Sequence, residues 1–290
     1  MHYIVLDLEW NIAGNANKVE KATQEAIPFE IIEIGAVKLD DRFQIVSKFS
    51  VCIRPQIYPI LSGHVAAVTR RLQQSLKYGL HFKDAARDFL KWCGEDYLFC
   101  TWSESDISVL RSNLKFHGLA GDLQAECLDV QYVFDELIER ADIQRSIEYA
   151  LDFLRLPKNQ PFHQAVSDAW YTGLILQKIA DISQEEQAST RFIQRYSFNP
   201  NLNRACQMTL DGHLSIPAAL TALQELAMTC PACGLALDQQ LAWKLEGSKA
   251  LATFNCPDHG RIRGKTRFRS RSDSQVQAKV AIRIDRDQEG

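Results

Sequence analysis

The chain has 290 residues, enough for one large domain or two modest ones. Its hydrophobic share of 46% and charged share of 24% are those of an ordinary globular protein, and they exclude disorder along the whole chain. No apolar stretch reaches the roughly 20 residues of a membrane helix, so we expect neither membrane insertion nor a secretory route.

Charge is distributed unevenly along the chain. Residues 1–182 hold 19 Lys and Arg against 25 Asp and Glu, whereas residues 183–290 hold 14 against 11. The two parts of the chain are therefore expected to have different functions. Most of the eight cysteines are scattered without paired spacing, which is typical of a reducing compartment, and we expect a cytoplasmic location.

Strand-like and helix-like segments alternate through the first part of the chain. Three runs rich in β-branched and aromatic residues follow one another closely enough to pair antiparallel: residues 3–10, 30–39 and 43–53. Later segments alternate in period, with helices at 82–93, 107–117, 133–140, 147–154 and 164–180 and short strands at 97–101 and 127–130. This order predicts an α/β fold in which helices flank a mixed sheet.

The composition becomes polar between Ser183 and Asn203, and we expect a domain boundary there. Ser215 and Pro217 then predict the start of a helix that runs to about Ala227. The predicted organisation is a first domain at 1–182, a linker with one helix at 183–225, a small domain at 226–272 and a polar tail at 273–290.

Two carboxylates stand out in the first strand. Asp7 and Glu9 are two residues apart, so both side chains project from the same face of an otherwise apolar strand. Carboxylates in such a strand are costly unless a cation or hydrogen bonds compensate them. An acidic solvent face is the alternative interpretation of this pair.

Three further segments accompany this pair. Glu30-Ile31-Ile32-Glu33-Ile34-Gly35-Ala36-Val37 follows it, Asp106 opens a helix after a short strand, and His163 precedes Asp168 by five residues at the start of another helix. In this order the motifs resemble the DEDDh exonucleases, the DnaQ-like 3′→5′ exonuclease family. The resemblance covers about residues 1–182, and the details of the motifs look most like the branch of ERI-type RNA exonucleases.

The resemblance implies a ribonuclease H-like fold and a role for each residue. It implies that Asp7, Glu9, Asp106 and Asp168 hold two divalent cations and that His163 is the general base. Mg²⁺ and Mn²⁺ suit such a site, because hard cations prefer carboxylate oxygens and are completed by substrate phosphate. His163 and Asp168 cannot share one face of a regular helix, so we expect His163 on the preceding loop and Asp168 in the first turns.

Some positions depart from the common family pattern. Trp10 follows Glu9 where many relatives have a small residue, and it is predicted either to stack on a nucleic-acid base or to belong to the core. The segment 61–72 keeps only Val68-Thr69-Arg70 of a turn that typically lines the pocket for the terminal nucleotide. Glu33 and Glu104 are interpreted as solvated residues or as residues that support the metal ligands.

A second constellation lies near the other end. Cys230 and Cys233 are separated by two residues, and Cys256 and His259 repeat this spacing, each pair closing on a glycine. The intervening residues suit a hairpin around Glu246-Gly247-Ser248. The pattern is similar to a Cys3His zinc ribbon with one structural Zn²⁺, and the alternative is a set of unrelated thiols and imidazoles.

Basic residues occupy every second position directly after this cluster. On a strand they would form one positive face suited to nucleic-acid phosphates; a solvated edge strand protected by charge is the alternative. The residues are Arg261, Arg263, Lys265, Arg267, Arg269 and Arg271.

Together these features predict a metal-dependent 3′→5′ exonuclease that acts on single-stranded RNA or DNA 3′ ends, with RNA favoured. The competing hypothesis is a nucleic-acid-binding or protein-docked module with the same fold that acts inside a larger complex. In that case the C-terminal domain would bind a protein partner.

Overall fold

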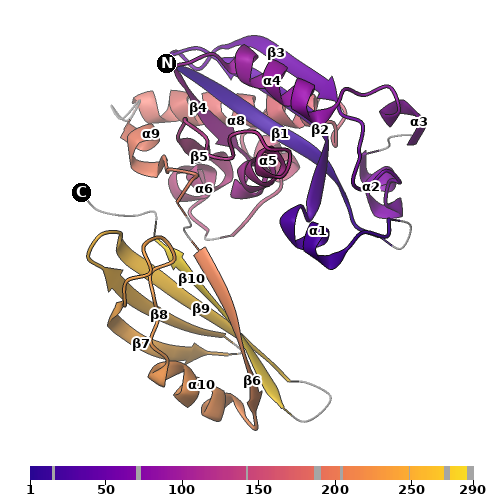
Figure 1. Cartoon of the computed structure of the whole chain (residues 1–290). Helices are drawn as coiled ribbons and strands as arrows, with labels where there is room; N and C mark the ends of the chain where they lie inside the picture. Colours follow the sequence, from indigo (N-terminus) through magenta and orange to yellow (C-terminus); the bar gives the residue numbers. More distant parts are fainter. Residues whose placement is uncertain are drawn as a thin grey trace. The chain divides into compact units, whose positions relative to one another are not determined.

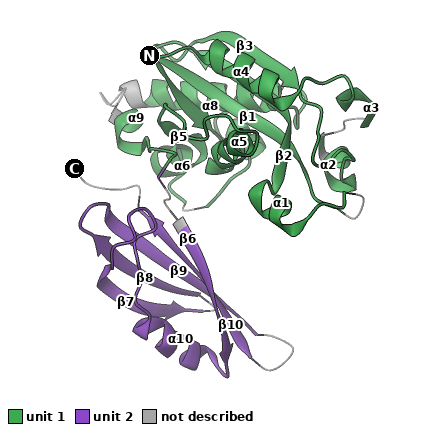
Figure 2. Ribbon diagram, in the orientation of Figure 1, with its two compact units in different colours: residues 1–201 green, residues 202–290 purple. Residues whose placement is uncertain are grey.

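The chain forms two compact units, residues 1–201 and residues 202–290 (Figure 2). The computed structural model describes residues 1–14, 17–69, 73–141, 143–185, 191–202, 205–247, 249–270 and 275–285. Within these ranges, no helix combines the length and the apolarity needed to cross a bilayer.

A five-stranded mixed sheet forms the centre of the first unit (Figure 1). Its strand order is β3-β2-β1-β4-β5, and the strands are β1 (His2–Ile12), β2 (Phe29–Leu39), β3 (Ile45–Cys52), β4 (Tyr97–Thr101) and β5 (Cys127–Asp129). The first three strands pair antiparallel, whereas β4 is parallel to both β1 and β5. The predicted α/β class with a mixed sheet is confirmed.

Helices cover both faces of this sheet, because the side chains of its strands alternate between two hydrophobic clusters. Tyr3 and Val5 of β1 pack into the cluster that also contains α6 (Val130–Phe134), α7 (Ile147–Phe153), α8 (Ala165–Glu185) and α9 (Arg191–Tyr196). Ile4, Leu6 and Leu8 pack into the opposite cluster, with α4 (Phe82–Cys93) and α5 (Glu104–Phe116). The face of β1 that carries Asp7 and Glu9 is therefore the face covered by α8.

Several short elements of the first unit lie outside the sequence prediction. The predicted helix at 133–140 is α6 followed by a π-helical turn, η1 (Asp135–Glu139), which ends at Arg140 with a left-handed backbone. Three short helices with few or no buried apolar residues complete the unit: α1 (Lys21–Ala26), α2 (Gly63–Thr69) and α3 (Gln73–Leu76).

The first unit extends to Asn201, so the division between the units lies within the polar stretch at 183–203, where the sequence predicts a boundary, although the predicted first domain ends at residue 182. Phe192, Ile193 and Tyr196 of α9 are buried in the hydrophobic cluster on the face of the sheet that α8 covers. The backbone of Phe198 pairs with that of Cys127. The polar composition of this segment concealed its buried aromatic side chains.

A five-stranded antiparallel sheet forms the second unit, with strand order β6-β10-β9-β8-β7. Helix α10 (Ile216–Glu225) begins after Ser215, whose side chain accepts a hydrogen bond from the Ala218 amide, and it packs on one face of the sheet. The strands are β6 (Ala205–His213), β7 (Asp238–Glu246), β8 (Lys249–Cys256), β9 (Gly260–Ser270) and β10 (Val276–Ile284).

The C-terminal organisation therefore differs from the prediction. The expected hairpin is present as β7 and β8, but it is part of a larger sheet rather than a small ribbon. The predicted linker at 183–225 contains α9, β6 and α10, and the predicted polar tail at 273–290 contains β10. In β10, apolar residues at every second position are buried, while the polar residues between them made the segment look solvated.

Candidate active site

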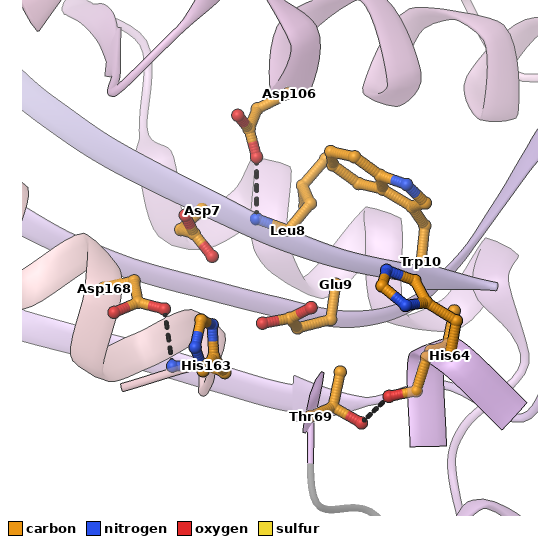
Figure 3. A pocket seen from close by; sticks show the side chains of 10 residues that line it. Asp7, Leu8, Glu9, Trp10, His64, Thr69, Asp106, His163 and Asp168 are labelled. Carbon is orange, nitrogen blue, oxygen red and sulfur yellow. Dashed lines mark hydrogen bonds between the residues drawn. The ribbon is translucent and has the colours of Figure 1, made fainter. Parts of the chain in front are cut away.

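A pocket of about 290 Å³ lies beside the second half of β1 (Figure 3). Four segments line it: β1, α2, the first turn of α5, and α8 with the loop before it. All five residues that the family resemblance implies for catalysis are present, together with residues that the sequence did not single out. The lining consists of Asp7, Leu8, Glu9, Trp10, His64, Val65, Thr69, Asp106, His163 and Asp168.

Three carboxylates converge in this pocket. Asp7 and Glu9 lie on the same face of β1, and Asp168 lies in the first turn of α8. One ligand atom from each of the three lies within 4.8 Å of the others. In Figure 3 their side chains point toward one another and toward His163. The predicted convergence of distant acidic residues is found for these three.

Gly35 allows α8 to approach this closely. It lies opposite Asp7 in the pairing of β1 with β2, and a Cβ at this position would lie 2.0 Å from the Val166 amide nitrogen. The Ala165 carbonyl carbon would be only 2.1 Å away. A side chain is therefore excluded, and the start of α8 rests directly on the sheet beside Asp7.

His163 and Asp168 have the expected arrangement. His163 lies on the loop before α8 with a φ of 64°, in the left-handed region that is uncommon for residues other than glycine. Its backbone N–H donates a hydrogen bond of 2.9 Å to Asp168 Oδ2. This contact holds the loop against the first turn, and the exposed imidazole faces the pocket.

Asp106 enters the pocket from α5, on the opposite side of the sheet from α8. Ser103 caps this helix with its side chain, and Asp106 Oδ1 accepts a hydrogen bond of 2.9 Å from the Leu8 amide. The pairing of β4 with β1 ends at Val5, so the Leu8 amide is available to Asp106 instead of to a strand. Asp106 lines the same pocket but stands outside the close group of Asp7, Glu9 and Asp168.

The acidic side chains are costly in their ionised forms. Burial, and then the negative charges of Asp106, Asp168, Glu9 and Glu33, raise the pKa of Asp7 well above its usual range. Burial raises the pKa of Asp106 to about 7 and that of Asp168 to about 6, against the hydrogen bonds that favour their charged forms.

The donor set fits divalent cations. Asp168 Oδ1 is buried and has no hydrogen-bond partner among the described residues. An ion that attracts three or four carboxylate oxygens would satisfy this atom and relieve the mutual repulsion of the group. Hard cations such as Mg²⁺ and Mn²⁺ prefer such ligands.

A second wall of the pocket comes from α2. His64, Val65 and Thr69 contribute to it. Buried Asn11 fixes the segment before α2: its Nδ2 donates to the carbonyl oxygens of Tyr58 and Ile60, and its Oδ1 accepts from the Ser62 amide. No signal in the sequence marks this wall, because the burial of Asn11 in β1 follows only from the fold.

Trp10 lies partly in the core and partly in the pocket. A register shift between Glu9 and Trp10 marks a bulge, which is a common way to redirect a side chain near a site. The half-buried indole packs 5.7 Å from the Phe29 ring and also lines the pocket. Thr69 of the Val68-Thr69-Arg70 segment reaches the same pocket; Arg70 and the side chain of Val68 lie outside the described residues.

The two additional glutamates have different surroundings. Glu33 is buried and lies opposite Glu9 in the sheet, so the interpretation of a solvated residue is wrong for it. Its charge adds to the repulsion that Asp7 and Asp168 experience. Glu104 is half-buried at the start of α5 and does not line the pocket.

The Cys3His cluster of the second unit is assembled as predicted. Cys230 Sγ lies 3.6 Å from His259 Nδ1, Cys233 Sγ lies 3.6 Å from Cys256 Sγ, and Cys256 Sγ lies 3.7 Å from His259 Nδ1. Ligand atoms placed tetrahedrally around Zn²⁺ are separated by about 3.5–3.8 Å, so the set fits that ion. The glycines that close the two turns, Gly234 and Gly260, both have positive φ angles.

The basic run forms β9, with its charged residues exposed on the sheet face opposite α10. Two of its members are engaged, since Asp285 Oδ2 lies 2.7 Å from Arg263 Nε and 3.5 Å from Arg261 Nε. Lys265, Arg267 and Arg269 line a shallow pocket on this face. Arg271 lies outside the described residues.

Known proteins resemble this chain in sequence and in fold. Residues 4–176 match the RNase T family model, described as "Exonuclease". The probable 3′-5′ exonuclease KapD of Bacillus subtilis (strain 168) is 30% identical over 129 residues, which are 44% of this chain and 60% of that protein. The chain thus matches less than two thirds of the length of this curated relative.

Two solved structures share the fold at low sequence identity. The nuclease domain of 3′hExo, a DEDDh family member bound to rAMP, aligns with a TM-score of 0.54 and 16% identity over 65% of this chain and 94% of that chain. Exonuclease I of E. coli in complex with single-stranded DNA aligns with a TM-score of 0.53 and 11% identity over 87% of this chain and 54% of that chain. The chain therefore belongs to the RNase T-type exonuclease family, and residues 4–176 carry the family domain.

Proposed function

We propose that this chain is a metal-dependent 3′→5′ exonuclease that hydrolyses phosphodiester bonds at single-stranded nucleic-acid 3′ ends. The convergence of Asp7, Glu9 and Asp168 beside Asp106 and His163 in one open pocket carries this proposal. Membership of the exonuclease family and the similarity to a probable 3′-5′ exonuclease support it.

Each of the five residues has a proposed part in the reaction. Asp7, Glu9, Asp106 and Asp168 would hold two Mg²⁺ or Mn²⁺ ions, whose chemistry is to activate water and to offset charge on the departing 3′ oxygen. His163 takes a proton from the attacking water as general base. Asp168 has a second part, because its hydrogen bond to the His163 amide keeps the imidazole at the pocket.

RNA is the favoured substrate in this proposal, on the basis of the sequence resemblance to the ERI-type branch. The 2′-hydroxyl is the group by which a protein distinguishes RNA from DNA. The α2 wall and Trp10 are the parts of the pocket available to contact the terminal nucleotide. The alternative, a binding module without turnover, is less well supported, since the pocket is open and all five residues line it.

The experiment that tests this function compares the full chain with the Asp7→Asn variant on RNA and DNA oligomers labelled at the 5′ end. We expect stepwise shortening from the 3′ end with Mg²⁺ or Mn²⁺, faster on RNA, and a loss of about 100-fold or more in the variant. Asp88→Asn, which removes one exposed carboxylate from α4, is the matched control and should retain activity. Internal cleavage products or an undiminished Asp7→Asn variant would discard the mechanism.

We infer that Cys230, Cys233, Cys256 and His259 hold one structural Zn²⁺. Four protein ligands leave no open position, so this ion would stabilise the turns of the second unit rather than take part in hydrolysis.

Removal of this ion should affect the second unit alone. After stripping with a strong chelator we expect one zinc released per chain, faster amide hydrogen exchange in residues 202–290 and unchanged exchange in residues 1–201. Re-addition of zinc is the control and should restore protection. Unchanged exchange in both units after complete chelation would contradict a structural zinc site.

A further inference from the structure

The basic run on β9 lies in the middle of the sheet of the second unit. Strand β9 has β10 on one side and β8 on the other, so both of its edges are paired. Charges that protect a sheet from edge-to-edge association belong on edge strands. The edge-strand interpretation of this run is therefore wrong, and the charges need another explanation.

Cations face one another across three strands of this face. Arg267 lies directly opposite Lys249 of β8 and directly opposite Lys279 of β10. Like charges in such cross-strand pairs are destabilising. Within the described residues, no carboxylate lies within ion-pairing distance of Lys265, Arg267, Arg269 or Lys279. Among the residues that the structure describes, these four positive charges near the centre of the sheet thus have no carboxylate partner.

The same four residues line a shallow pocket of about 370 Å³. Its remaining lining includes Gln207 and Thr209 of β6, which add uncharged hydrogen-bonding groups. Arg261 and Arg263, at the other end of β9, are instead paired with nearly buried Asp285. At one end of the strand two cations therefore share one carboxylate, whereas at the other end the described residues include no carboxylate partner.

The aromatic side chains of β7, β8 and β9 point toward the opposite face of the sheet, which packs against α10. Trp243, Phe254 and Phe268 are buried in the core between the sheet and α10. On the exposed face of β8, β9 and β10, the described residues include no aromatic ring that could stack on a base. A ligand of this face is recognised by charge and by hydrogen bonds.

We propose that Lys265, Arg267, Arg269 and Lys279 form a binding site for the phosphate backbone of single-stranded nucleic acid. The proposal rests on the exonuclease function proposed above and names the part of the chain that retains the substrate strand. Guanidinium groups bind phosphate through paired N–H donors, and cations repeat along β9 at about 6.8 Å, two residues of strand rise. Binding is sequence-independent and strongly salt-dependent.

The test measures binding of labelled single-stranded oligonucleotides to the full chain, in an Asp7→Asn background that prevents cleavage, over a series of KCl concentrations. For single strands, each phosphate contact contributes about 0.7 to the slope of log K against log salt. We expect Lys265→Ser/Arg267→Ser/Lys279→Ser to lower this slope by about 2, equally for oligonucleotides of different sequence.

Two single variants on the same strand and face provide the matched comparison. Arg267→Ser removes an uncompensated cation and should lower the slope by about 0.7. Arg261→Ser removes a cation already engaged with Asp285, which retains Arg263, and should leave slope and affinity nearly unchanged. Equal effects of the two variants, or no effect of the triple variant, would overturn the proposal.

Hydrolysis of a dinucleotide separates this proposal from the function on which it rests. A dinucleotide occupies the catalytic pocket but is too short to need a second site, so the triple variant without Asp7→Asn should cleave it at the wild-type rate. Its KM for long oligonucleotides should rise. Absence of metal-dependent shortening of long oligonucleotides by the wild type would reject the proposed function, whereas wild-type hydrolysis combined with unaltered binding of long strands by the triple variant would reject the phosphate site alone.

Discussion

At the scale of single residues, His163 has an unfavourable backbone conformation. Its φ of 64° costs energy for any side chain with a Cβ, yet the hydrogen bond from its amide to Asp168 maintains it. The structure thus keeps an imidazole at a position where glycine would be easier to accommodate. This arrangement is consistent with a role for the side chain rather than for the fold.

Substitution of His163 should separate stability from activity. We expect His163→Gly to be more stable than His163→Ala by about 1 kcal/mol, because glycine adopts the left-handed conformation without strain. Both variants should lose activity by about 100-fold or more if the imidazole is the general base. Denaturant unfolding and steady-state kinetics measure the two effects, and a fully active His163→Gly variant would contradict the proposed role.

At the scale of elements, the site depends on how closely two of them approach. The start of α8 lies on β2 at Gly35, opposite Asp7, and this contact brings Asp168 and His163 to the carboxylates of β1. On the other side of the sheet, Asp106 joins α5 to β1 through the Leu8 amide. Two helices on opposite faces of one sheet therefore complete a single pocket.

Gly35→Ala should disrupt this approach. The added Cβ would overlap the backbone of Ala165 and Val166, so α8 must shift, and we expect a loss of about 3 kcal/mol in stability together with activity. Gly63→Ala is the control: a Cβ there meets nothing within 4 Å, and its stability should change by less than about 1 kcal/mol. Similar effects of the two substitutions would contradict the packing argument.

Much of the first unit could be predicted from the sequence, because its main elements have clear periodicity. The strand at 97–101 and the helix at 82–93 have the predicted bounds, and Asp7, Glu9 and Asp168 converge as expected. The wall formed by α2 could not be predicted, since Asn11 holds it through contacts to residues about 50 positions away. Likewise, β6 and β10 are stabilised mainly by pairing within the second sheet.

At the scale of the whole molecule, the acidic pocket opposes folding when its cations are removed. Burial and mutual repulsion raise the pKa values of Asp7, Asp106 and Asp168, so the folded state favours their protonated forms. The unfolded chain ionises these groups near pH 4. The contribution of these groups to the stability of the metal-free protein is therefore most favourable below about pH 4. It is lost as pH rises through about 6 to 7.

This linkage predicts opposite effects of pH and of divalent cations. The free energy of unfolding of the metal-free chain should fall between pH 5 and pH 8, with a contribution on the order of 1 kcal/mol from Asp168, whose pKa of about 6 lies about one unit above the start of this interval. Added Mg²⁺ should restore stability at pH 8 and have less effect at pH 5, since it binds the ionised carboxylates of the folded state. Denaturant titrations of Asp7→Asn/Asp168→Asn provide the control, in which both dependences should weaken.

The two-sided packing of β1 limits how its length can vary. Asp7 and Glu9 face α8, whereas Ile4, Leu6 and Leu8 face α4 and α5. Inserting or deleting one residue near Val5 would exchange these faces. Leucine side chains would then point into the pocket, and the carboxylates would point into the hydrophobic core beside α4 and α5. An insertion scan of the gene should thus recover almost no functional clones with extra codons in β1, whereas we expect the exposed turn at Asp41 and Arg42 to accept them.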